Sequence, residues 1–166
     1  MTPNEPSLTP PEPLTDAHEV ADFDCGEPTL NIWLQRRALA NQASGASRTF
    51  VVCREQHAVG YYALAAGGIA STEAPGRARR NMPDPIPMMV LGRLAVDRRG
   101  QGQGLGVLLL RDAVARTQRV AVEFGIAGIV VHAISEEAKR FYQRWGFVEA
   151  PNHPMTLIAR LKDIGE

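Results

Sequence analysis

Residues 98–110 join a glycine-rich loop to a change from strand-like to helix-like patterning, and this junction constrains the fold most. An almost continuous apolar run over Met88–Val96 precedes the loop and is typical of a strand buried on both faces. Residues 100–106 then read GQGQGLG. Apolar residues from Leu105 to Val120 recur near helical spacing. The pattern therefore predicts a buried strand that turns through glycines into a long amphipathic helix.

Such a junction is suited to an anionic ligand. The first amides of a helix have no partner within the helix, and the helix dipole favours negative charge there. Glycine lets a phosphate approach the backbone closely, because no Cβ stands in the way. Arg98 and Arg99 add positive charge beside the loop. We therefore expect a pyrophosphate site at this junction.

Two common phosphate motifs do not fit the same residues. A P-loop requires Gly-Lys-Ser/Thr, and the loop has no lysine. A dinucleotide fingerprint requires a third glycine, where this chain has Val107, and an acid ending the next strand. That strand, predicted over Ile126–Ala133, carries no acid.

Strand and helix patterns alternate along the chain, which predicts an α/β fold. Further strands are expected over 49–53, 59–65, 147–148 and 155–161, and helices over 30–41 and 136–145. A loop is expected over 71–87. Residues 1–13 contain five prolines and predict a flexible or extended lead-in, which leaves 14–166 as a single domain.

Charge is distributed unevenly, although the net charge is zero. Residues 1–27 hold seven acids and no lysine or arginine, so the rest of the chain is basic and rich in arginine. A basic, arginine-rich segment of this kind is compatible with binding of a phosphate-rich ligand or a nucleic acid. No apolar run reaches the length of a membrane span, and no signal peptide is recognisable. The two separated cysteines favour a reducing cytoplasm, and the histidine spacing predicts no metal site.

The loop resembles the signature of the GNAT N-acetyltransferase superfamily, Gln/Arg-x-x-Gly-x-Gly/Ala. Gln101, Gly104 and Gly106 match it, and an overlapping match begins at Arg99. The resemblance implies the GNAT fold, a mixed central sheet flanked by helices, with acetyl-CoA as cosubstrate. It also implies that loop amides bind the pyrophosphate and that the preceding strand binds the pantetheine arm. The cofactor-binding residues so implied are Leu94, Ala95, Val96, Arg99, Gln101, Gly102, Gln103, Gly104, Leu105 and Gly106.

A second signature lies at residues 141–147, which read FYQRWGF and resemble the family pattern Phe-Tyr-x-x-x-Gly-Phe. Taken alone, Tyr142 is a packed aromatic residue on an amphipathic helix. The resemblance implies that it is the catalytic acid. Acetyl transfer expels the thiolate of coenzyme A, and a phenol with a pKa of about 10 can protonate a thiolate.

The predicted strand Met88–Val96 contains no carboxylate that could deprotonate an attacking amine. This favours a substrate amine that is already partly neutral near pH 7. An α-amine, with a pKa of about 8, fits better than a lysine side chain at about 10.4.

Most of the chain, about residues 14–162, is similar to the GNAT toxins of type II toxin–antitoxin systems. The likeness includes residues 23–34 (FDCGEPTLNIWL), 59–64 (VGYYAL) and 91–97 (LGRLAVD). It implies acetylation of the α-amine of aminoacyl-tRNA, which blocks translation. It also implies a small ribbon-helix-helix antitoxin as partner and a homodimer.

Several arginines could contact tRNA phosphates, although a solvated surface or a mobile loop explains most of them equally well. Arg93 interrupts an apolar strand and is therefore expected to have a specific partner. The candidates are Arg36, Arg37, Arg77, Arg79, Arg80 and Arg93. Two other functions remain open: a GNAT enzyme acting on a small-molecule or protein amine, and a catalytically silent coenzyme A-binding module.

Overall fold

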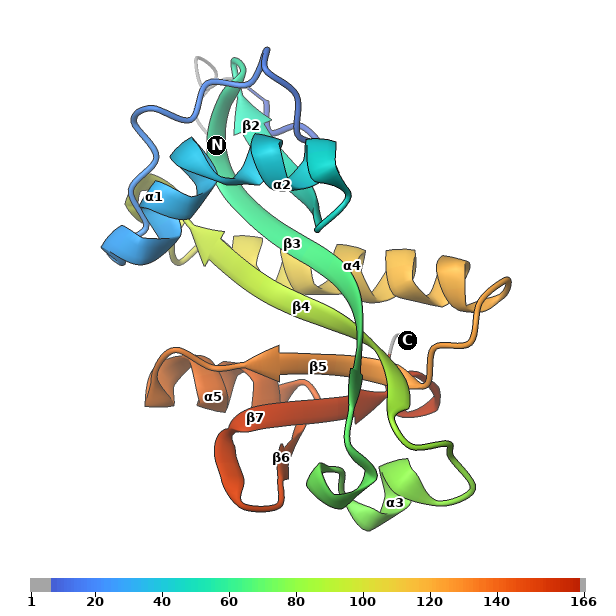
Figure 1. Cartoon of the computed structure of the whole chain (residues 1–166). Coiled ribbons are helices and arrows are strands. Elements are labelled where there is room, and N and C mark those ends of the chain that lie inside the picture. Colours follow the sequence, from blue (N-terminus) through green and yellow to red (C-terminus); the bar gives the residue numbers. More distant parts are fainter. Residues whose placement is uncertain (1–6, 165–166) are drawn as a thin grey trace. The chain divides into compact units, whose positions relative to one another are not determined.

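The computed structural model describes residues 7–164, whose strands form one seven-stranded sheet in the order β1-β2-β3-β4-β5-β7-β6. The pair β4–β5 is parallel, whereas β1–β2, β2–β3, β5–β7 and β6–β7 are antiparallel. The expected α/β fold with a mixed sheet flanked by helices is therefore confirmed. The elements, of which Figure 1 labels α1–α5 and β2–β7, are β1 (Glu12–Pro13), α1 (Pro28–Arg36), α2 (Ala38–Ser44), β2 (Arg48–Arg54), β3 (His57–Ile69), η1 (Ser71–Glu73), α3 (Gly76–Arg79), β4 (Ile86–Val96), η2 (Arg98–Gly100), α4 (Leu105–Ala121), β5 (Gly128–His132), α5 (Glu136–Arg144), β6 (Val148–Ala150), β7 (His153–Arg160) and η3 (Leu161–Asp163).

The chain forms two compact units. The first contains the residues up to Leu64 together with Arg93–Asp112, and the second contains Ala65–Gly92 and the residues from Ala113 onward. Strands β3 and β4 and helix α4 each begin in one unit and end in the other.

In the first unit, α1 and α2 pack over β2 and β3 around an aromatic core. The ring of Tyr61 meets Phe23 edge-on at 5.5 Å and stacks on Trp33 at 6.0 Å. Its hydroxyl donates to the Leu30 carbonyl at 2.7 Å, which satisfies the buried polar group. The single helix predicted over 30–41 is instead two helices, because Arg37 departs from helical geometry at φ −119°.

Residues 7–13, part of the predicted flexible or extended lead-in, run as extended backbone beside β2. Thr9 N–H donates to the Cys53 carbonyl, and the Cys53 N–H donates to the Thr9 hydroxyl, both at 2.9 Å. Strand β1 then pairs Glu12 with Val51. Residues 1–6 of that segment lie outside the described residues.

In the second unit, β4 and β5 pair from Met88 with Gly128 to Leu91 with Val131. Five more residues of β4, Gly92–Val96, follow the last of these pairs. The loop predicted over 71–87 contains η1 and the short helix α3, because Ala74 and Ala78 bury their methyl groups in the core beneath it. Over residues 7–164 we find no helix with the length and hydropathy that crossing a bilayer requires.

Candidate active site

The glycine loop has the backbone geometry of an anion site. Gly102 and Gly104 adopt φ angles of +80° and +79°, which L-residues with side chains rarely adopt. A Cβ at either position would meet no atom within 4 Å, so both glycines face open space. Within residues 7–164, the amides of Gly102, Gln103 and Gly104 donate no hydrogen bond. Helix α4 begins at Leu105 and adds its own unpaired amides, so the loop fits a diphosphate.

The polar side chains of the loop hold its shape. The side-chain amide of Gln101 donates to the Val96 carbonyl at 3.0 Å and to the Cys25 carbonyl at 3.2 Å. The Gln103 side chain accepts a hydrogen bond from Arg54 at 3.3 Å. The side chains of Gln101 and Gln103 therefore stabilise the loop conformation. The exposed backbone amides of the loop are left to bind a ligand.

Arg99 was expected to contact the cofactor, but its side chain binds Asp97. Its Nε and Nη2 donate to the two oxygens of that carboxylate at 2.8 and 3.1 Å. Asp97 is only 1% exposed, and burial alone would raise its pKa. Hydrogen bonds from Arg99 and from the Asp24 amide outweigh burial and lower the pKa of Asp97 below its ordinary value.

Asp97 also joins the loop to the segment before α1, a role that sequence patterns missed. Its carboxylate accepts the Asp24 N–H at 2.9 Å, and the Arg98 N–H donates to the Asp24 carbonyl at 2.8 Å. The side chain of Asp24 in turn accepts from Gly26 N–H at 2.9 Å. The sequence places Asp97 directly before the loop, but no local pattern indicates a partner 73 residues away.

The end of β4 supplies the backbone expected to bind the pantetheine arm. Ala95 is buried, whereas Leu94 and Val96 are half-buried. The Asp97 N–H donates to the Val59 carbonyl of β3 at 2.9 Å, so the strand end is held beside β3.

Tyr142 lies on α5, which begins where the Ser135 hydroxyl accepts the Ala138 N–H at 3.1 Å. The ring is 7% exposed and packs edge-on against Phe141 and Phe147. Burial raises the pKa of its hydroxyl above the ordinary value. That hydroxyl donates no hydrogen bond to any residue from 7 to 164. The geometry thus offers a protonated phenol without a protein acceptor.

The arginine candidates occupy different surroundings. Arg36 and Arg37 at the end of α1, and Arg79 and Arg80 around α3, are exposed and form no ion pair within the described residues. Arg77 is 79% exposed and lies 4.0 Å from Asp163.

Arg93 has the specific partner that its place in an apolar strand predicted. Its guanidinium lies 4.3 Å from the centre of the Trp33 ring, which stacks in turn on Tyr61. A cation over an indole face is attracted by the ring quadrupole. The aromatic core of the first unit therefore orders this side chain.

One cluster has the residue types of a metal site, namely Glu12, His18 and Cys53. The His18 Nδ1 accepts the Thr15 N–H at 2.9 Å, so Nε2 carries the proton and donates to Glu12 at 2.8 Å. The neutral ring then has no lone pair left for a metal. The cluster fits a half-buried hydrogen-bond network better than a metal site.

Comparison with known proteins identifies the family. Residues 45–149 match the family model described as acetyltransferase (GNAT) domain. The chain is 50% identical over 153 residues, 92% of both proteins, to a tRNA-acetylating toxin of Mycobacterium tuberculosis.

Two solved structures extend the comparison. The structure of AtaT complexed with acetyl-methionyl-tRNAfMet matches with a TM-score of 0.87 and 31% identity, covering 94% of this chain and 96% of that one. A Tyr-to-Phe mutant of the AtaT toxin, bound to the C-terminus of the antitoxin AtaR and acetyl-CoA, matches with a TM-score of 0.79 and 33% identity, covering 93% and 94%. By its sequence and its fold, this chain belongs to the GNAT acetyltransferase family.

Proposed function

We propose that this protein transfers the acetyl group of acetyl-CoA to the α-amine of aminoacyl-tRNA and acts as the toxin of a type II toxin–antitoxin pair. The observation that carries the proposal is the 50% identity, over 92% of both chains, to a tRNA-acetylating toxin. A capped α-amine cannot attack in peptide-bond formation, so acetylation stops translation. Charged tRNA is found in the cytoplasm, which is where we expect the protein to act.

The glycine loop would hold the cosubstrate. Amides from Gly102 to Gly106 are free to bind its diphosphate, and the backbone of Leu94–Val96 would bind the pantetheine arm. Arg98 lies beside the loop with its side chain 66% exposed and its Nε 3.9 Å from the Asp24 carboxylate. The guanidinium of Arg99 is hydrogen-bonded to the Asp97 carboxylate. We therefore propose that Arg99 helps to hold the loop in position.

Tyr142 would act as the catalytic acid. The attacking amine forms a bond to the thioester carbonyl carbon, the carbon–sulfur bond breaks, and the departing thiolate takes the phenolic proton. The proton that the amine loses passes through solvent and restores the phenol. Burial of Tyr142 raises the pKa of the phenol, which keeps the proton in place at neutral pH. The carbonyl oxygen would be polarised by a backbone amide, for which the Val96 N–H is our candidate.

The amine needs no strong base. Strand β4 carries no carboxylate over Met88–Val96, and an α-amine with a pKa of about 8 is partly neutral at pH 7. This chemistry supports an aminoacyl ester as acceptor more than a lysine side chain.

Partners follow from the same proposal. The exposed, unpaired arginines of α1 and α3 would contact tRNA phosphates, together with Arg77. The Arg93 guanidinium already packs on the Trp33 ring, so Arg93 would contact RNA only next to that ring. We also propose a small ribbon-helix-helix antitoxin as protein partner, and a homodimer as the active form.

Isotope transfer tests the function. Purified protein is mixed with acetyl-labelled acetyl-CoA and either total charged tRNA or the same tRNA after mild alkaline deacylation. We expect label in charged tRNA alone. Label that enters a free amine or a protein, with none in charged tRNA, would contradict the proposal.

A further inference from the structure

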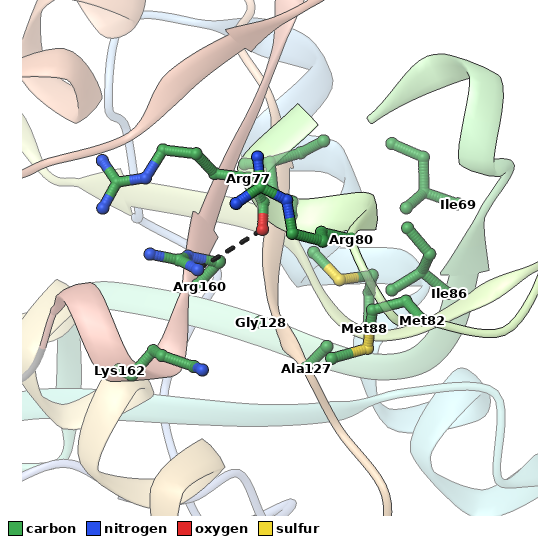
Figure 2. A pocket seen from close by; sticks show the side chains of 12 residues that line it. Ile69, Arg77, Arg80, Met82, Ile86, Met88, Ala127, Gly128, Arg160 and Lys162 are labelled. Carbon is green, nitrogen blue, oxygen red and sulfur yellow. Dashed lines mark hydrogen bonds between the residues drawn. The ribbon is translucent and has the colours of Figure 1, made fainter. Parts of the chain in front are cut away.

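The second unit contains a pocket that takes no part in the proposed chemistry. It lies where β4, β5 and β7 meet α3 and η3, and neither the glycine loop nor Tyr142 lines it (Figure 2). Its volume is about 430 Å³, including the part open to solvent. The lining residues are Ile69, Arg77, Ala78, Arg80, Met82, Ile86, Met88, Ala127, Gly128, Ile158, Arg160 and Lys162.

The walls of the pocket are apolar and belong to the core. Ile86 and Ile158 are each 1% exposed, and Met88 is 3% exposed. They pack with Ile69 and Ala78 in one buried cluster. Because these side chains are fixed by the core, the pocket is formed before any ligand arrives.

Four cationic side chains surround the opening. Arg160 is held in place, since it donates to both oxygens of Asp163 at 2.7 and 2.9 Å and to the Arg77 carbonyl at 3.3 Å. Figure 2 shows Arg77, Arg160 and Lys162 on one side of the pocket and apolar side chains on the other. Among residues 7–164, Arg80 forms no ion pair, and Lys162 acts on the Asp163 carboxylate only through its charge, without a direct ion pair.

The charge balance at the opening favours an anionic ligand. Within residues 7–164, Asp163 pairs with Arg77 and Arg160, so one negative charge lies beside the four cations. Guanidinium groups bind carboxylates and phosphates through paired hydrogen bonds. The ligand must therefore carry negative charge beside an apolar group.

The lining residues distinguish a peptide from RNA. In the part of the chain that the structure describes, no aromatic ring lines the pocket, and no Asn, Gln, Ser or Thr side chain does so. Unpaired bases are usually bound by stacking on aromatic rings and by hydrogen bonds to their edges. An aliphatic side chain needs neither of these.

We propose that this pocket is a docking site for a segment of a partner protein in which an aliphatic side chain is flanked by carboxylates. The aliphatic side chain enters between Met82, Met88 and Ile158. The carboxylates bind Arg80 and Lys162, with Arg77 beside them. This proposal does not depend on the substrate of the acetyl transfer.

Methionine methyl groups report directly on the pocket, because Met82 and Met88 line it while Met89 and Met155 do not. The full chain, labelled with ¹³C at methionine methyls, is titrated with the peptide acetyl-EELEE-amide. We expect shifts of Met82 and Met88 that exceed those of Met89 and Met155. The peptides acetyl-EEAEE-amide and acetyl-KKLKK-amide should bind at least tenfold more weakly.

Charge reversal provides the second readout. The double variant Arg80→Glu/Lys162→Glu should weaken binding of acetyl-EELEE-amide at least tenfold. The double variant Arg48→Glu/Arg119→Glu, at two exposed arginines outside the pocket, makes the matched charge change and should alter binding less than twofold.

Three results would overturn the proposal. The first is an absence of Met82 and Met88 shifts with the leucine peptide. The second is equal binding of the leucine and alanine peptides. The third is a single-stranded RNA hexamer that shifts both methyls when the peptide does not, which would assign the pocket to RNA.

Discussion

The carboxylate of Asp97 accepts the backbone N–H of Asp24 at 2.9 Å and the fork of Arg99 at 2.8 and 3.1 Å. One buried acid thus fastens the glycine loop to a segment 73 residues away. Because the loop carries the amides proposed to bind diphosphate, Asp97 positions the cosubstrate without touching it.

Replacing this acid should loosen the loop. Asp97→Asn retains one acceptor but loses the charge that binds Arg99, so we expect a loss of about 1–3 kcal/mol in the free energy of unfolding. The KM for acetyl-CoA should rise several-fold more than kcat falls. Urea unfolding and steady-state kinetics measure the two effects. Asp163→Asn is the control, since its pair with Arg160 is exposed and should change stability by less than about 1 kcal/mol.

Gly104 is a position of the loop at which a side chain would strain the backbone. Gly104→Ala forces a non-glycine residue to a φ of +79°, which costs about 1–2 kcal/mol. The added methyl group would also stand in the open space proposed for phosphate, so coenzyme A should bind at least tenfold more weakly by calorimetry. Gly125→Ala, where there is also open space but no positive φ, should leave binding unchanged. Equal affinities for the two variants would show that the loop does not hold the diphosphate.

Tyr142→Phe should affect the rate of transfer and little else. The variant removes one hydroxyl that makes no hydrogen bond within residues 7–164, so the melting temperature should be nearly unchanged. Losing a general acid typically costs about 10²–10⁴ in rate, and we expect kcat to fall accordingly with the KM for acetyl-CoA within about threefold. A variant that turns over at the wild-type rate would remove Tyr142 from the mechanism.

Cys53 predicts how stability changes at high pH. Burial raises the pKa of its thiol from 9.0 to about 11. Between these values the unfolded chain loses a proton that the folded chain retains, so stability falls as pH rises from 9 to 11 and this contribution is fully present below 9. One such group contributes a slope of at most about 1.4 kcal/mol per pH unit. Urea unfolding under reducing conditions should show a smaller slope for Cys53→Ala; equal slopes would contradict the assignment.

Local patterns in the sequence predicted the local structure of the site. The helical spacing from Leu105 predicted α4, and the helix expected over 136–145 corresponds to α5, which begins at Glu136. These features depend on residues within a few positions of each other, which a single sequence contains. The break between α1 and α2 at Arg37 was missed, because apolar spacing continues across it.

Contacts between distant segments could not be predicted in the same way. Arg93 was singled out as a charge within an apolar strand, but nothing near it identified Trp33 as its partner. The contact of the Asp97 carboxylate with the Asp24 N–H joins positions 73 residues apart, and no pattern near either residue indicated it. The pocket of the second unit is assembled from five segments and has no sequence motif.

The position of the acetyl group on its acceptor tests the central claim most directly. Charged tRNA is incubated with the protein and acetyl-CoA and digested with ribonuclease, and the terminal aminoacyl-adenosine is examined by tandem mass spectrometry. We predict a mass increase of one acetyl group on the α-nitrogen of the amino acid. The same short incubation with the Tyr142→Phe variant should give no such increase. Unmodified aminoacyl-adenosine, from a protein that still consumes acetyl-CoA with another amine, would contradict the proposed function.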